Sequence, residues 1–442
     1  MDTGDTAWVL ASTALVLFMT PGLALFYGGM VRAKNVLGTL MHSVFAMGLM
    51  AILWVIVGYT LAFGTDIGGF IGGFDFLGFR DVGAEAHPAG LGATIPHSLF
   101  ATFQMMFAVI TPALITGAFA ERIKFSGYVA FMAAWLLLVY APVAHWVFHP
   151  DGWLFKLGAL DFAGGTVVHI NAGIAALAVI LVVGKRKGFG KEAFVPHNLT
   201  MTILGTGILW FGWFGFNAGS ALGANGLAAS AFLATNLGAA AGALGWALME
   251  SRKERKATTL GVASGAVAGL VAITPAAGFV GPMGAIAIGL AGGLVCSWAV
   301  GLKFKLGYDD SLDVVGVHLV GGIVGSLLLG VFGTVAVNEF GADGIIAGGG
   351  LALMGKQILA VAATLVFSFV VTMGIAKAVE ATIGLRASEE DEIVGLDLSQ
   401  HSEVGYSLSE TAGSFSQRPE TAAAHATAAS QSHVIVTQGG GA

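Results

Sequence analysis

The sequence is short of charged residues and of cysteine, and both shortages narrow the kinds of protein that it can form. Charged residues occupy 10% of the 442 positions, against roughly 25% in an ordinary soluble domain. A chain with so little charge cannot cover a water-facing surface, so most of its surface must face lipid. The single cysteine, Cys296, excludes a disulfide framework and a cysteine-ligated metal centre. The net charge of -6, with no single basic patch, argues against nucleic acid as a partner.

Long apolar runs are what the chain has instead. Hydrophobic residues make up 56% of the sequence, and a helix needs about 20 mostly apolar residues to cross a bilayer. We therefore predict an all-α membrane protein with eleven transmembrane helices. The expected spans are 7–30, 40–63, 95–119, 126–149, 164–184, 199–218, 227–249, 259–277, 282–301, 312–335 and 348–384. The last run is long enough to be tilted or to project beyond the membrane.

The basic residues of the loops predict the orientation of these spans. Fourteen of the 20 Lys and Arg residues fall in loops on one side, whereas the opposite loops hold only Arg80 and Lys156. Cytoplasmic loops carry the excess of Lys and Arg, so we expect the N-terminus outside and the C-terminus in the cytoplasm. The first residues carry no basic region, and we expect no cleavable signal peptide.

The composition changes after about Leu385. Residues 386–406 are acidic and polar, and residues 407–442 are rich in Ser, Thr, Ala and Gly. The second stretch lacks the apolar content to fold alone and is predicted to be disordered. We thus expect a transmembrane domain over 1–385, a cytoplasmic tail over 386–406 and a disordered extension over 407–442.

Two histidines within the spans have matching surroundings. Asp161 precedes His169 by eight positions, Asp310 precedes His318 by eight positions, and glycines follow both histidines. Eight residues rise about 12 Å along a helix, so each His should lie well inside its helix. Asp161 lies at the outer end of its span and Asp310 at the inner end. This predicts two inverted repeats of five helices, plus a long final helix, with a shared site near the midplane.

We expect the two imidazoles to lie at the membrane centre, with ring nitrogens about 2.7–3.2 Å apart. Ionisable residues inside a membrane are costly and usually functional. The alternative is that His169 and His318 are unrelated polar residues, each packed against backbone carbonyls.

Seven segments of the chain resemble the ammonium transporter family (Amt/Mep/Rh), in its bacterial or archaeal Amt type. They are FYGGMVRAKNVL (26–37), GAFAERIKFS (117–126), LDFAGGTVVHINAG (160–173), GKRKGFGKEAFVPHNL (184–199), WFGFNAGS (213–220), DDSLDVVGVHLVGGIVG (309–325) and GLRASEEDEIVGLDLSQHSE (384–403). The resemblance implies a multi-pass channel of the plasma (inner) membrane for ammonium or ammonia. It also implies a homotrimer with one pore per subunit, no enzyme activity and no cofactor.

The resemblance also implies roles for particular residues along the pore. The twin pore histidines of the family correspond to His169 and His318, and the two stacked phenylalanines of its gate to Phe107 and Phe216. A narrow apolar pore disfavours a charged species, so the proton should leave the nitrogen there. Neutral imidazoles then offer a donor and an acceptor to ammonia.

The outer site that recruits ammonium would be formed by Phe107, Ser220 and an aromatic residue of the segment HWVF. Aromatic faces attract a cation, and a hydroxyl oxygen can accept its hydrogen bond. This aromatic residue is Phe148, where the family usually has Trp, and a neighbouring tryptophan could fill the place. Asp161 matches an acidic residue near the mouth that the family needs, either to stabilise the cation or to cap the local backbone.

The tail and the basic cytoplasmic loops suggest a partner. Residues 384–403 resemble the family's tail, and basic residues gather at 185–187 and 252–256. We expect this face to bind a PII-type signal protein, although the basic residues also serve to set the topology. The other expected partners are ammonium or ammonia, membrane lipid and two further copies of the chain.

Three other functions deserve comparison. A gas channel of the Rh type would lack an ammonium-recruiting site, and Ser220 and the tail argue against it. An ammonium sensor usually carries an output domain, and residues 386–442 are too short and polar for one. An enzyme is not favoured, because no metal-ligand cluster, phosphate-binding loop or nucleophile with a nearby base is visible in the sequence.

Overall fold

The structure is a computed structural model of the chain, and it describes residues 1–406. The predicted disordered extension, 407–442, lies outside the described residues. Residues 1–403 form one compact unit, so the segment 386–403 packs as part of the same body as the transmembrane helices.

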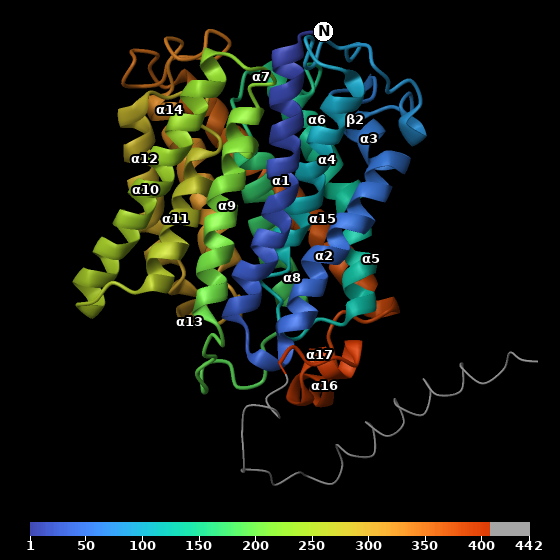
Figure 1. Cartoon of the computed structure of the whole chain (residues 1–442), viewed down its shortest axis with the longest axis vertical. Helices are drawn as coiled ribbons and strands as arrows, with labels where there is room; N and C mark the ends of the chain where they lie inside the picture. Colours follow the sequence, from blue (N-terminus) through green and yellow to red (C-terminus); the bar gives the residue numbers. More distant parts are fainter. Residues whose placement is uncertain (407–442) are drawn as a thin grey trace, which may run out of the picture. The chain divides into compact units, whose positions relative to one another are not determined.

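Long helices dominate this unit (Figure 1). They are α1 (Thr3–Met30), α2 (Val36–Leu53) with η2 (Trp54–Gly58) and α3 (Tyr59–Phe63), α4 (His97–Ile115), α5 (Phe125–Trp135) with η4 (Leu136–Tyr140) and α6 (Ala141–Phe148), η5 (Gly165–Ile170) with α8 (Asn171–Val183), α9 (Leu199–Gly219), α10 (Gly226–Glu254), α11 (Thr259–Ile273), α12 (Pro282–Ala299), η6 (Val315–Leu319) with α14 (Val320–Phe332), and α15 (Ala352–Thr382). Short elements join them: η1 (Ala33–Asn35), η3 (Leu77–Phe79), α7 (Trp153–Leu157), α13 (Leu302–Leu306), α16 (Glu389–Val394) and α17 (Leu396–His401), and strands β1 (Asp66–Ile67) and β2 (Ile71–Gly72), which pair antiparallel.

The predicted helical membrane fold is confirmed. Within residues 1–406, ten helices are long and apolar enough to cross a membrane. The predicted span 259–277 is the one that is not among them: it forms the shorter helix α11, which has 15 residues and is followed by a buried turn. Pro275 explains the early end, because proline has no backbone N–H and cannot continue the hydrogen bonding of the helix.

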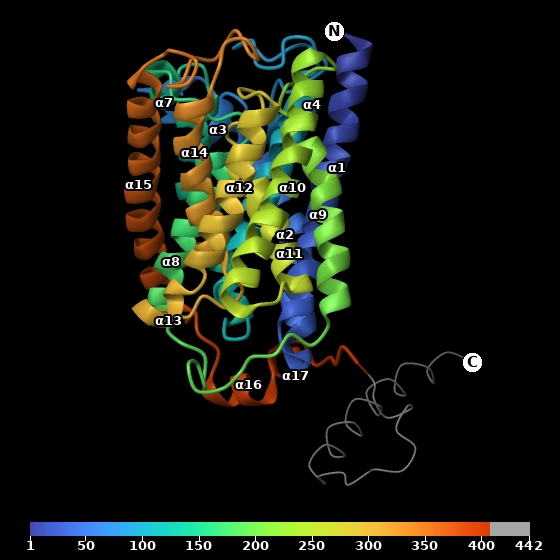
Figure 2. The same ribbon diagram turned by 90° about the vertical axis from the view of Figure 1, so that its left-hand side faces the viewer.

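The two helices that carry the histidines run in opposite directions. Figures 1 and 2 place α7, which precedes η5, at one end of the unit, and α8, which follows η5, towards the other. The order is reversed for α13 and α14, which flank η6. This is the arrangement that the inverted Asp and His spacing predicts.

The tail caps the first turns of two long helices. Asp397 of α17 accepts hydrogen bonds from the backbone N–H groups of Leu37 (2.9 Å) and Gly38 (2.8 Å) at the start of α2. The side-chain oxygen of Gln400 accepts from the N–H of Phe125 (2.7 Å) at the start of α5. The first N–H groups of a helix have no partner within the helix, so α17 supplies acceptors that α2 and α5 otherwise lack.

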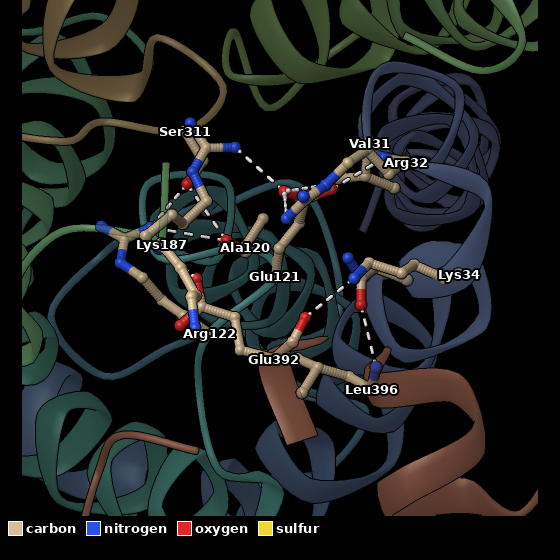
Figure 3. Close-up of polar contacts among 12 residues, drawn as sticks. Val31, Arg32, Lys34, Ala120, Glu121, Arg122, Lys187, Ser311, Glu392 and Leu396 are labelled. Carbon is tan, nitrogen blue, oxygen red and sulfur yellow. Dashed lines mark hydrogen bonds and ion pairs between the residues drawn. The ribbon is translucent and has the colours of Figure 1, made fainter. Parts of the chain in front are cut away.

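A buried ion-pair network joins the loops beside the tail (Figure 3). The Glu121 carboxylate is 1% exposed and pairs with Arg32 (2.9 Å) and Arg186 (3.1 Å), while Arg186 also pairs with Asp309 (2.9 Å). Burial raises the pKa of Glu121, but the hydrogen bonds from Arg32 and the charges of both arginines outweigh it and lower the pKa overall. Buried charges need partners of this kind to be stable.

Neighbouring polar contacts join these loops to one another and to the tail. The Arg122 guanidinium donates to the Ser311 hydroxyl (2.6 Å), and the Lys34 ammonium donates to the backbone carbonyl of Glu392 in α16 (2.9 Å), as Figure 3 shows. The loops and the tail are therefore held together by direct polar contacts.

Candidate functional site

His169 and His318 meet in the interior of the unit. Their Nδ1 atoms are 3.3 Å apart, slightly beyond the expected range, and the ring centroids are 5.4 Å apart. Both side chains are buried. His169 belongs to η5 and His318 to η6, and both segments are π-helical. Single π-helical turns are rare and occur often at functional sites.

Asp161 caps the segment that carries His169. Its carboxylate accepts hydrogen bonds from the N–H groups of Gly164 (2.8 Å), Gly165 (2.6 Å) and Thr166 (2.7 Å), and also from the Thr166 hydroxyl. These contacts favour the capping role over a direct role in holding the cation. The first N–H groups of η5 are satisfied by this one side chain.

Asp310 does the same for the segment that carries His318. It accepts from the N–H groups of Val314 (3.1 Å) and Val315 (2.7 Å). Burial, together with the nearby charge of Asp313, raises the pKa of Asp310 above its ordinary value. The repeated spacing of Asp and His is therefore the distance from a helix cap to the histidine that the helix presents.

A small cavity of about 10 Å³ lies against the histidine pair. Its lining residues are Met19, Leu23, Phe26, Ile110, Leu114, His169, Leu209, Trp213, Phe216, Val267 and His318. A cavity of this volume has room for about one molecule of the size of water. The His169 Nε2 atom is buried and has no hydrogen-bond partner among the described residues, so a small neutral molecule could bind there.

Phe107 and Phe216 close the cavity on one side. Their centroids are 4.3 Å apart with an angle of 44° between the rings, so the pair is tilted rather than parallel. Both rings are almost fully buried. Phe216 faces the imidazole of His169 at 6.1 Å and 18°. Since Phe216 lines the histidine cavity and Phe107 lines a second pocket, the ring pair separates the two spaces.

The second pocket, with a volume of about 90 Å³, contains three of the predicted recruitment residues. Its lining residues are Leu91, Phe100, Gln104, Phe107, Phe148, Phe162, Ser220 and Leu222. We call it the outer pocket. The fourth predicted recruitment residue, Asp161, does not line the outer pocket. The Ser220 hydroxyl donates to the Phe216 carbonyl (2.8 Å), which leaves its oxygen able to accept.

Phe148 itself occupies the place that the family resemblance assigns to an aromatic residue. Neither Trp146 nor Trp153 lines the outer pocket. The Trp146 indole donates to the Phe70 carbonyl (2.8 Å) and packs against Trp153, so these contacts keep it elsewhere.

Two residues of the site were missed by the sequence reasoning. Gln104 lines the outer pocket, and its place three residues before Phe107 on the same face of α4 could have indicated this. Trp213 lines the histidine cavity and stacks on His169, with centroids 5.4 Å apart. It lies three residues before Phe216, again on one helix face.

Across residues 1–406, no group of three or more His, Cys, Asp or Glu side chains is placed to hold a metal ion.

Comparisons with known proteins identify the family of the chain. The model of the Ammonium Transporter Family matches residues 7–406. An ammonium transporter of Bacillus subtilis is 53% identical over 407 residues, which cover 92% of this chain and 99% of that protein. Ammonium transporter Amt1 of Archaeoglobus fulgidus is 47% identical over 92% of this chain and 100% of its own. The crystal structure of Saccharomyces cerevisiae Mep2 superposes with a TM-score of 0.82, at 38% identity over 88% of each chain.

The capping role of Asp161 predicts a loss of stability on its removal. We expect Asp161→Ala to lower the free energy of unfolding by about 1–2 kcal/mol, because the N–H groups at the start of η5 lose their acceptor. Thermal unfolding of the purified protein in detergent measures this. Asp151→Ala is the matched control, since the Asp151 and Lys156 pair is half exposed and should contribute little. Equal unfolding temperatures for Asp161→Ala and the wild type would contradict the capping role.

Proposed function

The chain belongs to the ammonium transporter family, and we propose that it moves ammonium nitrogen across the plasma membrane in three steps. Ammonium binds in the outer pocket, gives up its proton at the Phe107 and Phe216 pair, and passes as ammonia along the two histidines. The observation that carries this proposal is the pair of spaces on either side of the phenylalanine rings. One is lined by aromatic and polar side chains, and the other is apolar except for its histidines.

The outer pocket suits a small cation. The Phe107 and Phe148 rings can attract ammonium through their faces. The Ser220 hydroxyl and the Gln104 amide oxygen can accept its N–H groups. All four residues line the same pocket, and a cation held there keeps part of its hydrogen bonding without entering the apolar space.

Charge is excluded at the phenylalanine pair. The rings pack at 4.3 Å, and the cavity beyond them holds about one small molecule surrounded by apolar side chains. An ion there would lose its hydration without replacement, at a cost of several kcal/mol. Desolvation favours the neutral form of an ionisable group, so ammonium gives its proton to water on the outer-pocket side of the rings and the nitrogen passes as ammonia.

The histidine pair then replaces part of the water that ammonia loses. Two neutral imidazoles in contact through Nδ1 share one proton, so one ring has an acceptor Nε2 and the other a donor Nε2. Ammonia is both a donor and an acceptor of hydrogen bonds. Among residues 1–406 the buried Nε2 of His169 has no hydrogen-bond partner, and this supports its role in binding ammonia.

The assembly that we propose is a homotrimer with one pore per subunit, with the N-terminus outside. The end of the unit that carries α16 and α17 then faces the cytoplasm. There the tail and the exposed basic residues at 252–256 form the docking surface for a PII-type signal protein. The support is the direct packing of the tail on the loops, which lets a bound partner contact both at once.

Flux measurements in liposomes test the function itself. We expect the wild-type protein to carry ammonium and methylammonium and to leave a potassium gradient intact. The double substitution His169→Leu and His318→Leu should reduce ammonium flux about tenfold or more, because ammonia would enter the cavity without hydrogen-bond partners. Potassium flux equal to ammonium flux in the wild type would refute the proposal.

Phe148 predicts a weaker outer site than a tryptophan would give. A cation gains more over an indole than over a phenyl ring, by about 0.5–1 kcal/mol at a partly wet mouth. We therefore expect Phe148→Trp to lower the half-saturation concentration for ammonium a few-fold. Phe155→Trp, at an exposed site outside the outer pocket, is the control. If Phe148→Trp leaves half-saturation unchanged or raises it, that ring does not recruit the cation.

The proposed docking surface predicts that binding of the partner requires the tail. A PII-type protein should be retained by the full chain and lost when residues 386–442 are removed. The pull-down is run across nucleotide and 2-oxoglutarate conditions. Arg80→Ala, which removes a basic residue from the opposite loops, should bind as the wild type does. Absence of binding to the full chain under every condition would contradict this proposal.

A further inference from the structure

The end of the short helix α11 reaches the histidine site. Thr274 follows the last residue of α11 and is fully buried. Its hydroxyl donates to the Leu270 carbonyl (2.7 Å) and accepts the indole N–H of Trp213 (2.9 Å). The direction of the first bond leaves the oxygen lone pairs free for the second, so both contacts are made by one hydroxyl.

Trp213 is the largest side chain against His169. Its ring stacks on the imidazole with 5.4 Å between centroids and an angle of 27°, and it lines the histidine cavity. Because the indole N–H is bound by Thr274, this donor is not free to bind a molecule in the cavity. Within the described lining, the histidines then supply the only polar side chains.

The next residue braces the helix that carries His169. The Pro275 carbonyl accepts the N–H of Phe162 (3.0 Å). At Gly165, the first residue of η5, an added Cβ would lie 2.4 Å from the Pro275 Cβ. The turn at 274–275 therefore contacts the start of η5 and, through Thr274, the ring that stacks on His169.

We propose that Thr274 is a positioning residue that maintains ion exclusion: it binds the Trp213 N–H, holds the indole face against His169 and keeps this donor out of the histidine cavity. A free N–H in the cavity would need a partner, since an unsatisfied buried donor is costly, and water is the partner at hand. Water in the cavity would hydrate an ion and weaken its exclusion. This inference rests on the proposed function for its consequence, but not for the contact itself.

Two substitutions separate the hydroxyl from the shape of the residue. Thr274→Val keeps the size and removes the acceptor, whereas Thr274→Ser keeps the acceptor. We expect Thr274→Val to lower the ratio of ammonium to potassium flux about tenfold in liposomes, and Thr274→Ser to behave as the wild type. Thr364→Val is the matched control, because Thr364 is equally buried and lines neither space.

A background without the indole N–H gives a second measurement. Trp213→Phe keeps an aromatic ring beside His169, so adding Thr274→Val to it should change the flux ratio no further. If Thr274→Val does not fold, Thr274→Ala in the wild-type and Trp213→Phe backgrounds tests the same coupling: the flux ratio should fall only where the indole N–H is present, and an equal fall in both backgrounds would contradict the inference. A hydroxyl that merely stabilises the fold would act equally in both backgrounds.

An experimental structure of Thr274→Val tests the positioning role of Thr274 without any transport measurement. The inference predicts that the Trp213 ring turns or that a water binds its N–H. An unchanged ring with no bound water, or a flux ratio equal to that of the wild type, would overturn the inference. Potassium leakage through the wild type would instead overturn the proposed function, and the structure would still decide the role of Thr274.

Discussion

A charge that leaves water for an apolar interior loses several kcal/mol of hydration, and the arrangement of this protein follows from that loss. The buried charges of Glu121, Arg186 and Asp309 are paired with one another in the loops. The side chains suited to a cation gather in the outer pocket, and the cavity beyond Phe107 and Phe216 holds apolar residues and two histidines. The same physical rule thus shapes both the folding of the loops and the proposed selectivity of the pore.

The ends of helices position the residues of the site. Asp161 and Asp310 satisfy the first N–H groups of the two segments that present the histidines. The early end of α11 brings Thr274 to Trp213. At the end of the unit that carries α16 and α17, Asp397 and Gln400 supply caps for α2 and α5. The run from α5 through α6 therefore begins at a contact with the tail and ends at Phe148 in the outer pocket.

Much of this could be predicted from the sequence, and the exceptions have physical causes. Apolar run length found the membrane helices, and the matched spacing placed His169 and His318 together, because both follow from local chain geometry. The π-helical turns around the histidines have no compositional signal. The short α11 did have one in Pro275, which the apolar run obscured. The tail is polar in sequence, but α17 packs on α2 and α5 and α16 contacts Lys34, and such long-range contacts are invisible in a local pattern.

The central claim is that cations stop at the outer pocket and do not enter the histidine cavity. Diffraction from crystals soaked in a rubidium salt tests it, because rubidium is a monovalent cation close in size to ammonium and scatters anomalously. The account predicts an anomalous peak beside Phe107, Phe148 and Ser220, which ammonium displaces, and none beside His169 and His318. A rubidium peak between the two histidines would contradict it.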